Sequence, residues 1–184
     1  MNVIKAINER RAYRSLKPVR ITEGLIRDLA RCAGLAPSCF NNQPSRFVFV
    51  YEHEALKNLH DALSKGNEWA HSASMIVVVF SKREDDCIIK DREYHQFDCG
   101  LAAAFLILRA TELGLVAHPI AGFSPRKTKE ILEIPDEYKV ITLIMIGTHS
   151  EEIDSILSEK QVEWEKKRPE RFPFEKISHL NRFK

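Results

Sequence analysis

The hydrophobic and polar positions along the chain switch between helical and strand spacing. Val3, Ile4 and Ile7 form the apolar side of a short first helix, which we expect to end near ERRAYRS. Thr22, a common helix-capping residue type, predicts the start of a second helix. The apolar face of this helix consists of Leu25, Ile26, Leu29, Ala30 and Ala33. Residues 53–64 predict a third amphipathic helix.

Three apolar runs predict strands, and a longer apolar segment predicts a central helix. The strands are expected at 46–51, 75–80 and 139–147. The long helix is expected from about Arg92 to Leu113, with Gly114 ending it. Its stretch 101–110 is apolar on all sides, which is typical of a helix in the core or in a subunit interface. Ser124 and Pro125 predict the start of a further helix.

The last segment, residues 150–184, is charged and has little periodicity, so we expect an arm that packs on something other than the core. Helices and strands alternate irregularly before it, and the strands are few. This order predicts an α+β fold, with a small central sheet surrounded by helices, in a single domain spanning 1–184.

The composition is that of an ordinary globular protein, with 44% hydrophobic and 29% charged residues among 184. A net charge of only +2 argues against a nucleic-acid partner. The longest apolar run, 101–108, is far shorter than the roughly 20 residues that span a bilayer. The N-terminus lacks an apolar signal core, so we expect a cytoplasmic protein with no membrane partner.

The four cysteines are Cys32, Cys39, Cys87 and Cys99, and no two of them form a CxxC pair. In a cytoplasmic protein this pattern predicts neither a disulfide framework nor a zinc site. We expect most of these cysteines to be small buried hydrophobic residues. The seven histidines also lack metal-ligand spacing, so no metal is expected.

Common catalytic motifs are absent from the sequence, which contains no GxSxG, Walker A loop, HExxH or GxGxxG after a strand. Four unusual segments remain, and the first three have two interpretations each. RRAYRS is a solvated helix end, or a clamp in which Arg10 and Arg14 share a helix face and bind a phosphate. PSCFNNQP is a helix-to-strand turn, or a site for a neutral hydrogen-bonding ligand.

The other two segments lie later in the chain. HPIAGF, residues 118–123, is a tight connection, or a place where the backbone approaches a flat ligand. KKRPERFPFEK, taken by itself, is a solvated basic tail. In order and spacing, these four segments together with DCGLAAAFLILRATELGL resemble the nitroreductase family of FMN-dependent oxidoreductases. The resemblance covers nearly the whole chain.

The resemblance implies an interlocked homodimer with an FMN in each of two clefts at the subunit interface, and an arm at 150–184 that packs on the partner. Arg10, Arg11, Ala12 and Arg14 would bind the phosphate, ribityl chain and pyrimidine edge, with Ala12 standing where the family often has serine. The loop residues that would reach the partner subunit's flavin are Pro37, Ser38, Cys39, Asn41 and Gln43. Pro119, Ile120, Ala121 and Gly122 would line the isoalloxazine, and Arg168 and Arg171, or Lys167 in place of either, would close on the phosphate.

The resemblance also implies the reaction. NADH or NADPH would give a hydride to FMN, and a small oxidant such as a nitroaromatic or a quinone would then be reduced, with ping-pong kinetics. The cofactor supplies this chemistry, so no catalytic side chain is assigned and Cys39 is not expected to react. A cation, most plausibly Arg14, would stabilise the reduced ring.

Other functions remain open within the same fold. Relatives of the family carry out dehalogenation, enone reduction, azoline oxidation or flavin destruction, often with added lids, and 81–94 is this chain's only candidate lid. A flavin storage or sensing protein would carry the same loops. Neither the physiological oxidant nor the choice between NADH and NADPH can be predicted from the sequence.

Overall fold

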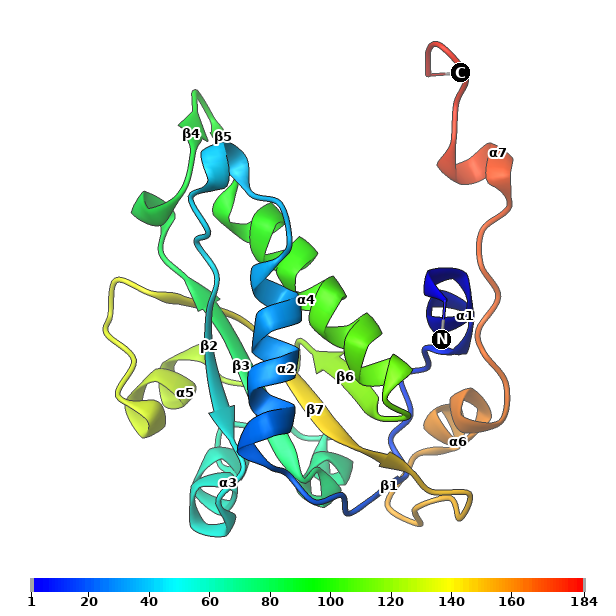
Figure 1. Cartoon of the computed structure of the whole chain (residues 1–184). Helices are drawn as coiled ribbons and strands as arrows, with labels where there is room; N and C mark the ends of the chain where they lie inside the picture. The colour runs from blue at the N-terminus through cyan, green and yellow to red at the C-terminus, as the bar shows by residue number, and fades with distance from the viewer. Residues whose placement is uncertain (1, 184) are drawn as a thin grey trace.

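The computed structural model describes residues 2–183 and has an α+β architecture (Figure 1). The helices are α1 Val3–Glu9, α2 Glu23–Gly34, α3 His53–His60, α4 His95–Glu112, α5 Pro125–Leu132, α6 Glu159–Lys166 and α7 Phe174–Ile177. The strands are β1 Leu16–Lys17, β2 Arg46–Val50, β3 Met75–Ser81, β4 Ile88–Ile89, β5 Arg92–Glu93, β6 Val116–Ile120 and β7 Lys139–His149. Short 3₁₀ turns lie at η1 Cys39–Asn41, η2 Glu68–Ser72 and η3 Arg83–Asp85.

The main sheet is antiparallel and is built around β7. This strand pairs with β3 on one side and with both β6 and β1 on the other, and β2 pairs with the far side of β3. A separate small hairpin is formed by β4 and β5. The small central sheet with surrounding helices therefore agrees with the sequence prediction.

The two faces of the sheet carry two hydrophobic cores, because alternate residues of a strand point to opposite faces. Val77 and Ile144 belong to the core that α2 and α4 cover, and this helix pair lies across the sheet in Figure 1. Val78 and Leu143 belong to the core on the other face, together with Leu59 of α3. Both β3 and β7 are thus buried on two sides, which explains their continuous apolar sequences.

Local capping signals place several helix boundaries where the sequence predicts them. The Thr22 and Ser124 hydroxyls accept hydrogen bonds from the Leu25 and Lys127 amides and cap α2 and α5. Gly114 has a φ of +77° just after α4, a left-handed conformation that glycine adopts without strain. These features depend on near neighbours in the sequence, so they are predictable from it.

Two predicted boundaries are wrong. The long helix starts at His95, not Arg92, because Arg92 and Glu93 pair with β4. The third helix ends at His60, four residues before the predicted Ser64. The first helix ends at Glu9, within the segment where the sequence predicts its end.

Four strands were not predicted, namely β1, β4, β5 and β6, of which β6 is the longest. We interpreted the region around HPIAGF as a connection, but 116–120 form β6. The strand tolerates Pro119 because it pairs with β7 alone and so lies at an edge of the sheet.

The C-terminal arm divides into two parts. Helix α6 packs on the segment after α1, whereas α7 and the residues after it extend away from the sheet (Figure 1). Large apolar residues of this outer part are more than half exposed, namely Phe172, Phe174, Ile177, Leu180 and Phe183. Within the described residues, no helix combines the length and the apolar character needed to cross a bilayer.

Candidate functional site

The arginine segment after α1 is extended rather than helical. Because the helix ends at Glu9, Arg10 and Arg14 do not share a helix face, and that part of the sequence interpretation is wrong. The chain instead runs from α1 into the short strand β1 and lies beside α6.

A pocket at this junction brings together the residues that the sequence places far apart. It is lined by Arg10, Arg11, Ala12, Arg14, Trp164, Arg168, Pro169 and Arg171. The early and late arginines expected at one phosphate site therefore do meet. Lys167 does not line this pocket, and its ammonium lies 3.9 Å from the Glu170 carboxylate on the surface.

The pocket is strongly cationic. Five arginines and no carboxylate are among its described lining residues. Burial lowers the pKa of Arg10, and the neighbouring charges of Arg168, Arg171 and Arg11 lower it further. Partial burial of like charges is unfavourable unless an anion neutralises them, so the pocket is suited to a phosphate.

Backbone and carboxylate contacts hold the arginine segment in place. Arg11 donates to the Trp164 and Glu165 carbonyls at 2.7 and 3.1 Å, near the C-terminal end of α6. The buried Glu165 carboxylate accepts from the Arg14 amide at 2.7 Å. Arg168 donates to the carbonyls of Asn8 and Arg10. Sequence reasoning missed Trp164 and Glu165, because their charged surroundings are typical of a solvated helix.

An aromatic residue connects the cationic pocket to β6. The Arg14 guanidinium lies 5.7 Å from the centre of the Trp69 ring, and the His118 ring stacks on Trp69 with 4.6 Å between the ring centres. His118 Nδ1 is 3.0 Å from the Tyr13 carbonyl oxygen. Burial lowers the pKa of His118 to about 4, and the nearby positive charges of Arg14 and Arg10 add to the effect. This histidine is therefore neutral at pH 7, and no sequence pattern distinguishes it from the other six histidines.

The segment after His118 presents small residues at the end of β6. Pro119 and Ala121 are exposed, while Ile120 is buried. Gly122 is tightly packed, since a Cβ atom there would lie 2.2 Å from Asn67 Nδ2. That same amide donates to the Gly122 carbonyl at 3.0 Å. The close approach that glycine permits here is thus to Asn67 of the same chain.

The polar loop after α2 forms a second, separate site. Pro37, Ser38 and Gln43 line a pocket, whereas Cys39 and Asn41 do not. Phe40, Asn41 and Gln43 all have positive φ, between 48° and 58°, a conformation that side chains other than glycine rarely adopt. The Ser38 hydroxyl accepts from the Gln43 amide at 2.9 Å and closes the loop on itself.

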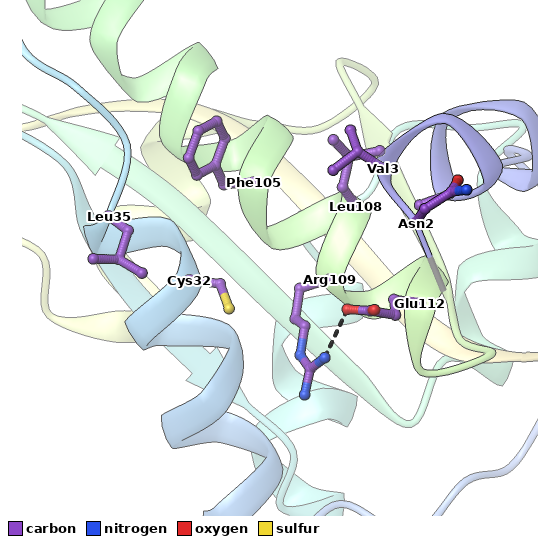
Figure 2. Close-up of a pocket in the computed structure, with 9 residues that line it drawn as sticks. Asn2, Val3, Cys32, Leu35, Phe105, Leu108, Arg109 and Glu112 are labelled. Carbon is purple, nitrogen blue, oxygen red and sulfur yellow. Dashed lines mark hydrogen bonds and ion pairs between the residues drawn. The ribbon is translucent and has the colours of Figure 1, made fainter.

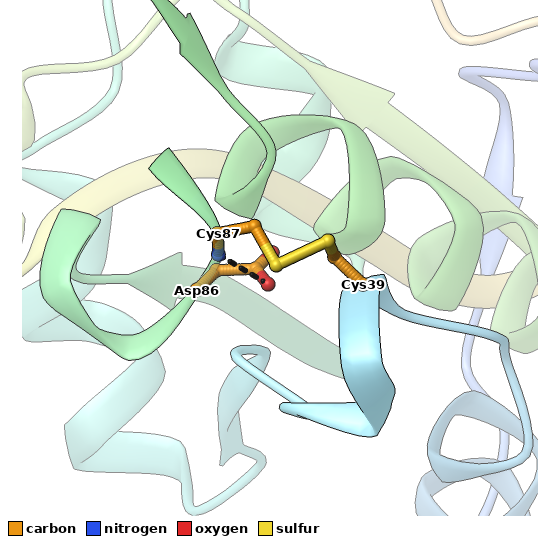
Figure 3. A group of neighbouring side chains, drawn as sticks. All are labelled: Cys39, Asp86 and Cys87. Atoms are coloured by element: carbon orange, nitrogen blue, oxygen red, sulfur yellow. Dashed lines mark hydrogen bonds between the residues drawn. A yellow bond between two sulfur atoms is a disulfide. The ribbon is translucent and has the colours of Figure 1, made fainter. Parts of the chain in front are cut away.

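The cysteines contradict one sequence prediction. Cys39 forms a disulfide with Cys87, so the pair is neither free nor simply buried (Figure 3). The two residues are 48 positions apart, and tertiary folding of η1 against the segment before β4 brings them together. Such a pairing has no spacing signal in the sequence. Cys32 and Cys99 are outside any disulfide, and of these Cys99 is fully buried.

The two sites lie apart in one chain. In Figure 1 the loop that follows α2 is beside the β4–β5 hairpin, whereas the arginine segment lies between α1 and α6 at the other side. One chain therefore does not assemble all the residues predicted for a flavin site.

A third pocket is apolar and lies between α1, α2 and α4 (Figure 2). Its lining residues include Val3, Cys32, Leu35, Phe105 and Leu108. The charged groups at its edge bind each other, since Arg109 donates a hydrogen bond to Glu112 at 2.7 Å. The pocket offers a surface for apolar packing rather than groups for chemistry.

Comparison with known proteins identifies the family. Residues 7–68 and 64–148 match the model of the nitroreductase family. An Archaeoglobus fulgidus protein with the provisional name NADH dehydrogenase/NAD(P)H nitroreductase is 29% identical over 160 residues, which cover 82% of this chain and 87% of the relative. The NADH dehydrogenase of Thermus thermophilus is 24% identical over 175 residues, which cover 78% of this chain and 85% of the relative.

Solved structures give the same result. A structure described as an oxidoreductase containing FMN is 30% identical, with a TM-score of 0.85 over 97% of this chain and 91% of that one. A nitroreductase family protein of Clostridium difficile, at 20% identity, shares the fold with a TM-score of 0.81 over all of both chains. The chain described here belongs to the nitroreductase family.

Proposed function

We propose that the protein is an FMN-dependent oxidoreductase that takes hydride from NADH or NADPH and reduces nitroaromatics, quinones or similar small acceptors. The observation that carries this proposal is the pocket of five arginines without a carboxylate, which suits the phosphate of FMN. The names of the relatives and the FMN-containing structure support the same cofactor and donor.

The residues at the arginine pocket have distinct tasks in this proposal. Arg10 and Arg171 would neutralise the phosphate, because no acidic partner occupies their side of the pocket. Arg168 and Arg11 would mainly hold the pocket together, through hydrogen bonds to backbone carbonyls. Arg14, half-buried above Trp69, would provide positive charge beside the ring when the cofactor is reduced.

The ring itself would lie along Pro119–Gly122 at the end of β6. Exposed Pro119 and Ala121 offer flat, small contacts, and the backbone there is held by Asn67. The polar loop Pro37–Gln43 would come from the partner subunit of a homodimer, since in one chain it lies away from the arginines. Exposed apolar residues of α1 and α4 and the outer part of the arm would form the interface.

FMN, when bound, supplies hydride and electron transfer between the nicotinamide donor and the acceptor. The chain's residues bind and orient the reactants and stabilise charge. His118 is not a proton donor in this proposal, because it is buried and its pKa is lowered to about 4. Donor and acceptor would use one cleft in turn, which gives ping-pong kinetics.

The proposal is tested by steady-state kinetics of the purified protein with added FMN. NADH or NADPH is varied at several fixed concentrations of a quinone or a nitroaromatic. Parallel lines in a double-reciprocal plot are expected. Intersecting lines would contradict alternate use of one cleft, and no turnover with any acceptor would contradict an enzymatic role.

A further inference from the structure

We propose that Cys39 and Cys87 form a reversible thiol–disulfide site that controls the polar loop between α2 and β2. The disulfide joins η1 to the segment before β4, two parts of the chain that are 48 residues apart (Figure 3). When the bond is present, it fixes the loop that carries Ser38 and Gln43. The effect on the cofactor rests on the proposed FMN function, whereas the thiol chemistry does not.

The loop needs stabilising contacts because its backbone conformation is unfavourable. Phe40, Asn41 and Gln43 have positive φ, a backbone conformation that is unfavourable for residues other than glycine. Hydrogen bonds that oppose this cost include one from the Gln43 amide to Ser38 within the loop and one from the Cys39 amide to the Asp98 carboxylate. The disulfide is the only covalent tie between this loop and the rest of the described fold besides the chain itself.

The position of the pair makes it accessible to small thiols. Both cysteines are only half-buried, whereas Cys99 is fully buried and its thiol pKa is raised by burial. Reactivity of cysteine depends on exposure and on thiolate formation. Cys39 and Cys87 can thus exchange with a thiol reagent under conditions in which Cys99 does not.

The acidic residue Asp86 lies beside the two cysteines. The Asp86 carboxylate is within 4.8 Å of both sulfurs and is 8% exposed. One of its oxygens has no hydrogen-bond partner among the described residues. A carboxyl group supplies no positive charge that would stabilise a thiolate beside it, so Asp86 does not favour the reduced pair.

The chemistry balances with an ordinary dithiol as reductant. One thiolate of the dithiol attacks a sulfur of the Cys39–Cys87 bond, and a mixed disulfide forms as the other cysteine leaves and takes a proton. The second thiolate of the dithiol then displaces the first cysteine. The protein gains two electrons and two protons, and the dithiol becomes a cyclic disulfide.

The first test maps the thiols of the purified protein without FMN. After mild oxidation and alkylation in denaturant, we expect two alkylated cysteines, Cys32 and Cys99, and a peptide pair joined through Cys39 and Cys87. After dithiothreitol, all four cysteines should be alkylated. Four free thiols after oxidation, or one zinc ion per chain held in place of the disulfide, would overturn the proposal.

The second test measures the loop and the cofactor in both forms. Reduction should speed hydrogen exchange of residues 37–44 and weaken FMN binding by about tenfold, a change that ordering one or two side chains can produce. Cys87→Ser should match the reduced protein and ignore dithiothreitol, and Cys32→Ser should behave like the unchanged protein. Equal exchange rates and equal FMN affinity in the two forms would overturn control of the loop.

The two proposals fail in different ways. If FMN binds in neither form, the proposed function is contradicted, and thiol mapping with loop exchange still decides the disulfide site. If FMN binds equally in both forms and the loop exchanges equally, the oxidoreductase remains and the thiol control is wrong.

Discussion

At the scale of single residues, the arginine pocket holds positively charged side chains that repel one another. Burial and three like charges lower the pKa of Arg10, so its charge is unfavourable until an anion arrives. A partly buried arginine that served folding alone would be paired with a carboxylate. Replacing Arg10 should therefore change the affinity for the ligand without lowering the stability of the fold.

Arg10→Ala should weaken FMN binding by roughly 10- to 100-fold, because a hydrogen bond to a charged group contributes about 1.5–3 kcal/mol. The flavin-free variant should unfold at the same urea concentration or a higher one, since repulsion is relieved. Fluorescence titration with FMN measures the first effect and urea unfolding the second.

The control for Arg10 is Arg126→Ala, which removes the same charge from an exposed ion pair with Glu130 on α5. It should leave FMN affinity unchanged. Loss of stability in Arg10→Ala without loss of affinity would show that Arg10 is structural and would contradict its place at the phosphate.

His118 predicts a pH dependence of stability. Its folded pKa, about 4, lies below its ordinary value of 6.5, so the unfolded chain binds a proton more readily. The contribution is complete above pH 6.5 and is lost as the pH falls toward 4, by at most about 3 kcal/mol. Urea unfolding of flavin-free protein between pH 7.5 and pH 4.5 measures it.

His118→Gln should show a shallower fall in unfolding free energy over the same pH range, because the titrating ring is absent. His53→Gln, an exposed position on α3, should follow the unchanged protein. Parallel curves for all three proteins would contradict a buried neutral His118.

At the scale of elements, the end of β6 depends on one side chain from another segment. Gly122→Ala would place a methyl group 2.2 Å from Asn67 Nδ2, so Asn67 must move and its hydrogen bond to the Gly122 carbonyl is lost. We expect a loss of about 1–3 kcal/mol in unfolding free energy and weaker FMN binding.

A double-mutant cycle separates the clash from other effects of the methyl group. Asn67→Ala alone should cost about 1 kcal/mol, and Asn67→Ala with Gly122→Ala should cost less than the sum of the two single changes. Gly24→Ala, where the added atom would lie 3.8 Å from Thr22 Oγ1, is the matched control and should be nearly neutral. Additive costs would exclude the contact as the cause.

The limits of sequence prediction also appear at this scale. Strands β2, β3 and β7 and the caps of α2 and α5 follow local patterns and were predicted. Strand β6 was missed because its proline and the glycines that flank it are typical of turns, and only pairing with β7 makes it a strand. The Cys39–Cys87 bond and the contacts of Glu165 join distant segments, so no local pattern could predict them.

At the scale of the whole molecule, the separation of the two sites in one chain is the main argument for a dimer. Large apolar side chains on α1 and α4 are exposed, including Val3 at 68% and Phe105 at 40%. Exposed apolar surface of this kind marks an interface. The loop of one subunit would then complete the arginine site of the other.

Mixing two variants with impaired FMN sites, assayed at an FMN concentration too low to fill either site, tests this arrangement. Arg10→Ala removes the phosphate contact, and Ser38→Ala with Gln43→Ala removes the loop contacts. If each cleft uses both subunits, a mixed dimer has one cleft with both defects and one intact cleft. We expect up to about a quarter of the unchanged activity after a statistical exchange of subunits. No recovery in confirmed mixed dimers would contradict a shared site.

The most direct test of the proposed function is the visible spectrum of the purified protein. We expect a yellow protein that binds about one FMN per chain, whose flavin bands bleach when NADH or NADPH is added without oxygen and return when a quinone is supplied. Bound flavin that neither nicotinamide bleaches would contradict the proposed donor. A colourless protein that does not take up added FMN would contradict the central claim.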